Sequence, residues 1–479
     1  MTNSGLNFII VGASVSGLAS AIALKRAGHS VLVLEKELEL GGIGSVPNGS
    51  GCAQICPNGC KILLDWGLEA EVNAKSATCS GFSLYKYTAG EASGPDQLGI
   101  NRYDPVVLDE ARGRYLQFAH RDLVRMLYDA AAVASSDKIE SSSAARVSIV
   151  FGAEVVNVDC DACSVTLQSG DIHTAHAIIG ADGTTGVVRR RLIEEEGASR
   201  QSDDGLGVAL YHATVPKALV DEHDLTVFYH HLGMTAWLGP NRGLKTLVVG
   251  NEQDISMFLF TPDSCQDSTW TREAETKITE VLGPCDERIR KLVELAGSVA
   301  CIQHEPPSKL ESWVSKSGRV LVLGDAAHPF PPGASQAYGV ALEDAAFIGK
   351  IFSHAKNPTR VPDFFRAFQE HREPRVSHLL DIEDEYRYYI LMPDGETQVE
   401  RDAAFRARHA IGQNVFDGDL EHMMEDVRIM FGYNATDDAD EWWMTWGRYL
   451  DAAELPPQQD AVRLTISEST TQGDQEDWL

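Results

Sequence analysis

The sequence predicts an α/β protein in which a Rossmann-like domain is interleaved with an antiparallel-sheet domain of the α+β type and followed by a helical carboxyl-terminal region. Three observations support this prediction. The first 35 residues follow a strand, turn, helix, strand order, which gives a βαβ unit with a right-handed crossover. Apolar runs at 177–183 and 319–324 each deliver an aspartate at their carboxyl end, where parallel sheets bind ligands. Residues 205–262 alternate like several strands of an antiparallel sheet.

The opening unit begins with residues 7–11, an unbroken run that favours a strand. Residues 16–27 are small, rich in alanine and helical in period, and Gly28 stands where such a helix would end. Residues 31–35 read as a second buried strand.

The elements that follow are placed by the same patterns. Residues 70–117 are strand-like and rich in turns, 121–134 return to a helix, and 147–176 alternate like a β-meander. The predicted strands of the second sheet are 207–215, 225–231, 244–250 and 255–260, and the predicted helices after it are 341–354 and much of 362–455.

The expected domain limits follow from this order. The Rossmann-like domain would be discontinuous, the sheet domain would be inserted into it, and the last stretch is polar and acidic enough to be mobile. The predicted limits are 1–70, 115–200 and 315–355 for the first domain, 71–114 and 201–314 for the second, 356–455 for the helical region and 456–479 for the tail.

Composition sets further bounds. The net charge of −29 argues against nucleic acid or an anionic membrane surface as a partner. No run of 18 or more apolar residues is present, and the amino terminus lacks a secretory signal, so we expect a cytoplasmic protein without a membrane span. The chain would be a monomer or a homodimer.

The nine cysteines fit reduced thiols better than a disulfide framework. Cys52, Cys56 and Cys60 are spaced to stack along one face of a helix, and they lack the spacing of zinc or iron–sulfur ligands. We therefore expect core packing here and no metal site anywhere in the chain.

The turn after the first strand is rich in small residues, Gly12-Ala13-Ser14-Val15-Ser16-Gly17. Such a turn brings backbone close to a pyrophosphate, and the helix that follows offers free N–H groups and a positive dipole end. Ser14 replaces the usual middle glycine. Glu35 ends the second strand, where an acidic residue binds ribose hydroxyls and disfavours a 2′-phosphate, so the nucleotide should be FAD or NAD.

Two later segments bear on the choice between FAD and NAD. One contains Asp182-Gly183, and the other contains Gly324-Asp325 and continues through residues 331–337. No second dinucleotide turn is present, because Gly205-Leu206-Gly207 precedes a strand. With these motifs the sequence resembles the group A flavoprotein monooxygenases, the family of para-hydroxybenzoate hydroxylase and salicylate hydroxylase, over residues 5–380.

The resemblance implies bound FAD and assigns roles to positions of this chain. The turn at Gly12 would hold the diphosphate, Glu35 the adenosine ribose, and Arg121 the phosphate or ribityl region. Asp182 would serve FAD and the nicotinamide cofactor, and Asp325 the ribityl chain. The residues implied at the cofactor are Gly12, Ala13, Ser14, Gly17, Glu35, Lys36, Arg121, Asp182, Gly183, Gly324, Asp325, Pro332, Gly333, Ala334, Gln336 and Ala337.

The resemblance also implies the chemistry. NAD(P)H would bind transiently and reduce FAD, O₂ would give a C4a-hydroperoxyflavin, and OH would pass to an aromatic or heteroaromatic small molecule. Oxidative decarboxylation of a para-hydroxybenzoate-like acid, and epoxidation of an isoprenoid or indole, are variants. A FAD-dependent oxidase or reductase that transfers no oxygen, and a flavin-binding regulator without catalysis, are the alternatives. The oxidase or reductase is motivated by Ala337, at a position where relatives commonly have glycine, and by the absence of the arginine that many relatives carry in the substrate sheet.

The substrate side is predicted from one strand and its neighbours. Tyr211-His212-Ala213 stands where many relatives place an arginine. At this position His212, which titrates near neutrality, replaces a permanently charged guanidinium. We expect catalytic roles for His212, Tyr211 and Pro332, and substrate contacts from His212, Tyr229 and Trp237. His230 and His231 are further candidates for the pocket wall.

Overall fold

The computed structural model describes most of the chain. The described residues are 5–41, 51–88, 94–132, 145–197, 208–229, 232–262, 269–274, 276–304, 309–355, 357–416 and 428–449. The predictions for residues 205–207, His230, His231 and the tail 456–479 lie outside these ranges.

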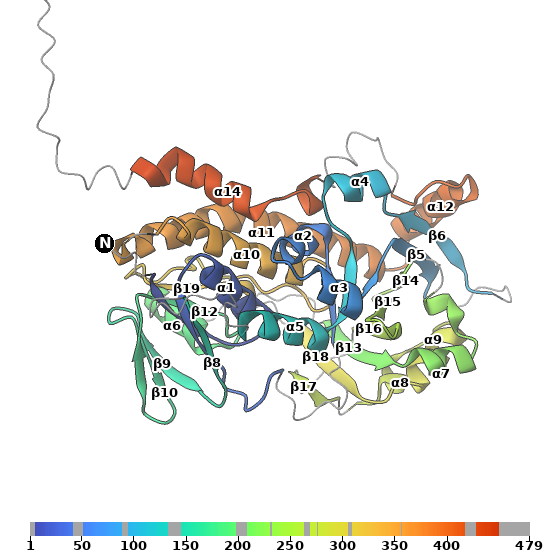
Figure 1. The fold of residues 1–479 in the computed structure, drawn as a ribbon. Coiled ribbons are helices and arrows are strands. Elements are labelled where there is room, and N and C mark those ends of the chain that lie inside the picture. Colours follow the sequence, from blue (N-terminus) through green and yellow to red (C-terminus); the bar gives the residue numbers. More distant parts are fainter. Residues whose placement is uncertain are drawn as a thin grey trace, which may run out of the picture.

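A five-stranded parallel sheet carries the amino-terminal motif (Figure 1). Every neighbouring pair in it is parallel. The apolar residues of its strands at 8–11, 177–179 and 320–322 are buried. The order across the sheet is β19 (Val320–Val322), β12 (Ala177–Gly180), β1 (Asn7–Val11), β2 (Ser30–Leu34) and β8 (Val147–Val150).

Helices cover this sheet. The pair α1 (Val15–Arg26) and α10 (Ala337–Phe352) packs closely, since a Cβ at Gly349 would lie 2.6 Å from the Ala23 Cβ. Helix α5 (His120–Ala132) packs against α1 as well, and α6 (Val187–Glu196) follows β12. The other helices near this domain are α2 (Pro57–Asp65) and α3 (Glu69–Lys75).

The second sheet has eight strands, all antiparallel except for the parallel pair β14 and β5. Its order is β17 (Thr269–Glu273), β18 (Val299–His304), β13 (Val208–Val215), β16 (Asp254–Thr261), β15 (Arg242–Val249), β14 (Met234–Gly239), β5 (Gly81–Lys86) and β6 (Gln97–Arg102). Two small antiparallel sheets complete the strands: β3 (Cys52–Ile55), β7 (Leu116–Ala119) and β4 (Ser76–Thr78), and β9 (Val155–Asp159), β10 (Ser164–Leu167) and β11 (Ile172–Thr174).

The eight-stranded sheet has two different faces. The helices α7 (Lys217–Glu222), α8 (Ile278–Val281) and α9 (Glu287–Glu294) lie beside it in Figure 1, and apolar side chains of α7, α8 and α9 form one core with the odd-numbered residues of β13. The other face looks toward α11 (Val361–Leu391), which contacts β14 and β15. This second face borders the site.

Helices dominate the carboxyl-terminal part of the described chain. Besides α11 they are α12 (Glu396–Ala410), which packs on β6, and α14 (Ala435–Trp442), which lies along α10 (Figure 1). The shorter helical segments are α4 (Pro105–Glu110), η1 (Thr226–Phe228), η2 (Gly324–Ala326), η3 (Pro358–Arg360) and η4 (Trp443–Gly447).

The structure confirms the predicted fold class and corrects four details. Strand β8 joins the parallel sheet and leaves the meander to β9–β11. In the described part of the strand expected at 225–231, residues 226–228 form the single turn η1, and Leu225 and Phe228 are buried in the apolar core. The second sheet is mixed, and Cys52 lies in β3, so the three cysteines do not share one helix face.

None of the described helices combines the length and the apolar composition needed to cross a membrane.

Candidate active site

The glycine-rich turn between β1 and α1 brings backbone segments into close contact. Gly12 has φ +104°, and a Cβ on it would lie 2.4 Å from the Ala181 carbonyl oxygen. A Cβ on Gly17 would lie 2.0 Å from the Gly12 carbonyl oxygen. Only glycine therefore fits at both positions. Ser14 is exposed at the N-cap of α1 and makes no side-chain cap, so its hydroxyl does not bind the first N–H groups of this helix.

Glu35 ties the end of β2 to this turn. Its carboxylate accepts hydrogen bonds from the Ala13 N–H at 2.7 Å and from the Glu37 N–H at 3.0 Å. The side chain is half-buried, and Lys36 beside it is exposed. The structure thus brings the acid predicted for ribose binding against the turn predicted for the diphosphate.

Asp182 has a structural partner. Its carboxylate accepts a hydrogen bond from the Val188 N–H at 2.9 Å, in the first turn of α6. Gly186 leaves room for it, because a Cβ there would lie 2.0 Å from the Asp182 Cγ. Burial raises the pKa of Asp182 to about 6. Asp182 and Gly183 therefore lie beside the glycine-rich turn, with Asp182 capping α6.

The second aspartate motif meets the same turn from β19. Gly324 has φ +58°, and a Cβ on it would lie 2.1 Å from the Ser16 Oγ of α1. Asp325 is exposed, and desolvation by the protein around it raises its pKa. Arg121 of α5 is also exposed, with its guanidinium 3.9 Å from Asp122.

The segment from Pro331 to Gln336 leads from the second aspartate motif into α10. Gly333 has φ +80°, and a Cβ on it would lie 3.5 Å from the Phe260 ring, so the segment passes over the sheet face. Glu383 of α11 accepts hydrogen bonds from the Ser335 N–H at 2.8 Å and the Gln336 N–H at 2.9 Å. A carboxylate thereby fixes the start of α10.

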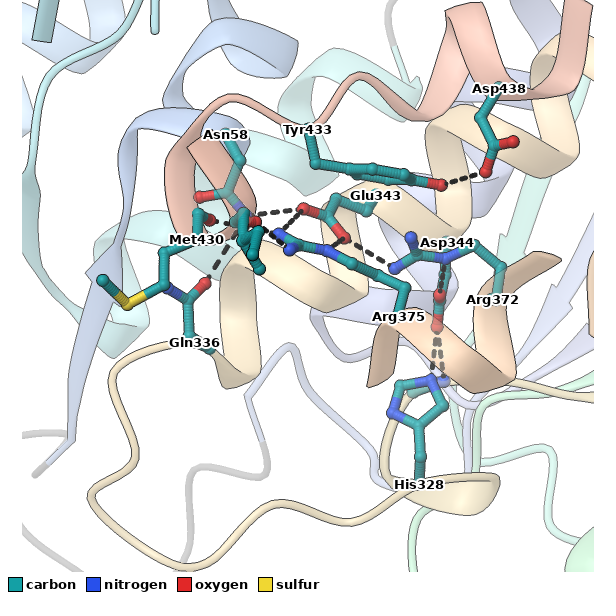
Figure 2. Close-up of polar contacts among 12 residues, drawn as sticks. Asn58, His328, Gln336, Glu343, Asp344, Arg372, Arg375, Met430, Tyr433 and Asp438 are labelled. Carbon is teal, nitrogen blue, oxygen red and sulfur yellow. Dashed lines mark hydrogen bonds and ion pairs between the residues drawn. The ribbon is translucent and has the colours of Figure 1, made fainter. Parts of the chain in front are cut away.

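Behind this loop lies a buried ion-pair network (Figure 2). Arg372 donates to Glu343 at 2.7 Å and to Asp344 at 2.9 Å, and all three side chains are buried completely. Asp344 also contacts His328 Nε2 at 2.7 Å and accepts from the Gly324 N–H at 3.2 Å. Arg375 lies 3.0 Å from the second oxygen of Glu343. The network holds the Gly324-Asp325 turn, α10 and α11 in one arrangement.

The same network reaches the segment before α14. Arg375 donates to the carbonyl oxygens of Ile429 and Met430. The ring of Tyr433 lies 5.1 Å from the Arg372 guanidinium carbon, and its hydroxyl donates to Asp438. Asn58 of α2 donates to Glu343 at 2.6 Å, as Figure 2 shows. Residues 428–433 are thus attached to α10 and α11.

A cavity of about 800 Å³ lies between the second sheet, the 331–336 loop and α11. Its wall is rich in aromatic side chains, and the Tyr103 and Tyr115 rings stack at 5.2 Å. The aromatic side chains that line it are Phe82, Tyr103, Tyr115, Phe260, Tyr386, Tyr389, Phe405, Phe416 and Phe431. Pro332, Gly333, Ala334 and Gln336 line it from the loop side. A cavity of this size and lining suits a flat organic molecule.

His212 lies on the cavity side of the sheet, behind Phe258. The two rings are 4.7 Å apart, and His212 Nε2 lies 2.9 Å from the Ser256 Oγ. Desolvation, with a smaller contribution from His120, lowers the pKa of His212 to about 3. The side chain is therefore neutral at physiological pH, contrary to the expectation that it titrates near neutrality. The residues that line the cavity do not include it.

The structure does not bring Tyr211, Trp237 and Tyr229 to the cavity. Strand alternation points Tyr211 and Trp237 to the opposite face, where they are buried in the core shared with α7–α9. The Trp237 ring stacks on Tyr85 there at 4.6 Å. The Tyr229 hydroxyl donates to Asp221 at the protein surface. This placement argues against substrate contacts from these three residues.

Two charged residues of the cavity wall were missed by sequence reasoning. Lys245 and Glu383 are both buried and both line the cavity. Lys245 could have been found from strand alternation, because it shares a face with Leu247 and Val249. Glu383 follows Val376 and Leu379 at helical spacing on the buried face of α11.

The residues that the structure assembles fit FAD. Glycines at close backbone approaches, the N-terminus of α1, an acid at the end of β2 and the exposed Asp325 meet along the carboxyl ends of the parallel strands. The 331–336 loop then leads from this edge of the sheet to the cavity, whose wall it forms in part.

The comparisons with known proteins agree with this fit. Residues 6–383 match the FAD binding domain family model. The chain is 28% identical over 413 residues to the FAD-dependent monooxygenase ntnJ of Nectria sp., covering 85% of this chain and 90% of the relative. It is 26% identical to the 3-hydroxybenzoate 6-hydroxylase of Polaromonas naphthalenivorans, over 79% of this chain and 85% of the relative.

Solved structures show the same fold. The crystal structure of CtdE in complex with FAD and a substrate superimposes with a TM-score of 0.71 at 18% identity, covering 93% of this chain and 100% of the other. With the family match spanning most of its length and relatives that are named monooxygenases and hydroxylases, the chain belongs to the FAD binding domain family and is a FAD-dependent monooxygenase.

Proposed function

We propose that the protein is a single-component monooxygenase that uses NAD(P)H and O₂ to hydroxylate an aromatic or heteroaromatic small molecule. The observation that carries the proposal is the cavity of about 800 Å³, whose walls are aromatic and which borders the loop that leads into α10. A planar substrate packed between such walls would lie next to the loop formed by residues 331–336 and so next to the cofactor.

The cofactor side of the proposal rests on this chain's own groups. When bound, FAD supplies hydride acceptance and oxygen activation. The α1 N-terminus at Ser14 would hold the diphosphate, Glu35 the ribose, and Asp325 the ribityl chain. Asp182 would act mainly by fixing α6 beside the diphosphate, since its carboxylate accepts from the Val188 N–H.

The substrate side is proposed with fewer residues than the sequence suggested. Pro332 and Gly333 would border the reacting ring from the loop side, where they line the cavity. His212 would act as a neutral hydrogen-bonding group on the cofactor side, because its lowered pKa removes its charge. Once a substrate fills the cavity, the substrate and the aromatic walls would limit the access of water, which protects reactive intermediates.

The substrate class is supported by a relative. A 26% identical protein is named 3-hydroxybenzoate 6-hydroxylase, an enzyme that acts on an aromatic acid by its name. We therefore expect a ring that carries polar substituents.

The test uses purified holoprotein with a panel of phenols, aromatic acids and indoles. We expect at least one of them to accelerate flavin reduction by NADH or NADPH in stopped flow, and ¹⁸O₂ to add one labelled oxygen to the product. Turnover with hydrogen peroxide but no labelled product would instead indicate an oxidase. Loss of CO₂ together with a gained oxygen would indicate oxidative decarboxylation, and a labelled epoxide would move the substrate class to alkenes or indoles.

A further inference from the structure

Lys245 stands in a row of side chains that crosses the cavity face of the eight-stranded sheet. In the strand register, Ala236 of β14 pairs with Lys245 of β15, and Lys245 pairs with Phe258 of β16. Phe258 in turn pairs with His212 of β13. Paired residues point to the same face, so Lys245 and His212 share a face with one strand between them.

The ammonium group of Lys245 is enclosed. The side chain is 9% exposed and lines the cavity. Within the described chain, it donates a hydrogen bond to the Gly333 carbonyl oxygen at 3.3 Å, in the loop formed by residues 331–336. Desolvation lowers the pKa of Lys245, while nearby Glu383, Cys52, Cys56 and Cys79 oppose this shift. A buried cation of this kind gains from an anionic partner.

The carboxylate that counteracts the lowered pKa of Lys245, Glu383, has other partners. Glu383 accepts hydrogen bonds from the N–H groups of Ser335 and Gln336 and from the Ser335 hydroxyl. The remaining charged lining residues are exposed or half-buried; they are Arg102, Asp104, Glu385 and Arg387. In the described wall, Lys245 is therefore the buried cation that a ligand in the cavity can reach.

We propose that Lys245 binds the substrate and holds an ionised ring hydroxyl, a phenolate or enolate, at the loop formed by residues 331–336. The hydroxyl proton is released to solvent, and Lys245 stays protonated as the counter-ion of the ring oxygen. This inference rests on the proposed monooxygenase function and narrows its substrate to rings with an acidic hydroxyl. Ionisation makes such a ring more electron-rich, which favours attack by an electrophilic oxygen. The aromatic wall would hold the ring while the ammonium fixes its orientation.

The test measures binding without turnover, in oxidised holoenzyme free of NAD(P)H. The probe is 4-nitrophenol, whose phenolate absorbs visible light and so reports its own ionisation; nitrobenzene is the uncharged comparison. We expect 4-nitrophenol to bind as the phenolate at a pH where it is mostly neutral in solution. Lys245→Met should weaken this binding about 10-fold or more and leave nitrobenzene affinity within about 3-fold. Lys245→Arg should retain most of the phenolate binding.

Lys309→Met is the matched control, because its side chain is 77% exposed and lies outside the cavity wall. Flavin content and thermal midpoint of every variant establish that the fold is kept. Equal losses of 4-nitrophenol and nitrobenzene in Lys245→Met would show a packing role and overturn the proposal. Binding of 4-nitrophenol in its neutral form, or no binding to the wild type, would overturn it as well. Failure of ¹⁸O incorporation would refute the monooxygenase function and leave these binding results standing.

Discussion

Replacement of Arg372 by methionine tests the buried network behind the loop. The substitution keeps most of the apolar volume and removes the charge that faces Glu343 at 2.7 Å and Asp344 at 2.9 Å, with all three side chains fully buried. Removing one partner of a buried ion pair leaves an uncompensated charge, which costs about 3–5 kcal/mol. Arg375 still faces Glu343 and His328 still faces Asp344, so we expect a loss at the lower end, about 3 kcal/mol.

The loss is measured as the free energy of unfolding in urea, followed by tryptophan fluorescence and by release of flavin. Arg191→Met is the control, because its pair with Glu194 is exposed at 3.5 Å and should change stability by less than about 0.5 kcal/mol. Adding Asp344→Asn to Arg372→Met should recover part of the loss, since it removes one stranded charge. A loss below about 1 kcal/mol for Arg372→Met, or no recovery in the double variant, would refute the assignment of this network as a stabilising element.

Three further predictions follow from the site. Gly17→Ala should abolish FAD retention without unfolding the chain, because its Cβ would lie 2.0 Å from the Gly12 carbonyl oxygen. The amount of flavin bound per protein after gel filtration measures the retention, and full retention would contradict the prediction. Glu383→Gln removes a negative charge at the start of α10 and should raise the two-electron reduction potential of bound flavin by roughly 7–20 mV. Glu385→Gln is the exposed control. An equal shift in both variants would count against an effect of the Glu383 charge on the flavin. His212 has a pKa lowered from 6.5 to about 3. Below pH 6.5 the unfolded chain therefore binds a proton that the folded chain does not bind, and the free energy of unfolding falls as the pH drops. His212→Gln should lessen this dependence of the free energy of unfolding on pH in urea unfolding, and an unchanged dependence would exclude the mechanism.

The sequence predicted the cofactor half of the molecule well, for a physical reason. Parallel strands are buried on both faces and read as continuous apolar runs, so residues 7–11 and 177–183 were recognisable as strands. Short motifs with backbone constraints follow them, and the structure shows the constraint directly at Gly12, Gly17 and Gly324, where a Cβ would strike a neighbour. Local sequence carries this information because the contacts concern the backbone.

The substrate half was predicted less well, because its geometry depends on pairing between distant segments. The parallel pairing of β14 with β5 joins residues some 150 positions apart, and no local sequence pattern predicts this pairing. Trp237 and Tyr211 have aromatic rings that carry a hydrogen-bonding group, so either could line a pocket or pack in a core. Only the strand register shows that they face the core formed with α7–α9. Lys245 was overlooked because a single lysine in an apolar strand is easily read as an edge residue, whereas β15 is flanked on both sides.

The charges around the cavity form a consistent pattern. In the network, Arg372 and Arg375 face Glu343 and Asp344, so its cations and anions balance. His212 is neutral and Glu383 is engaged by backbone N–H groups, which leaves Lys245 as the buried charge available to a ligand. The chain as a whole carries −29 and repels anions over roughly a Debye length of 8–10 Å. A ring hydroxyl that is neutral in solution avoids this repulsion, and we expect it to ionise only when it reaches Lys245 inside the cavity.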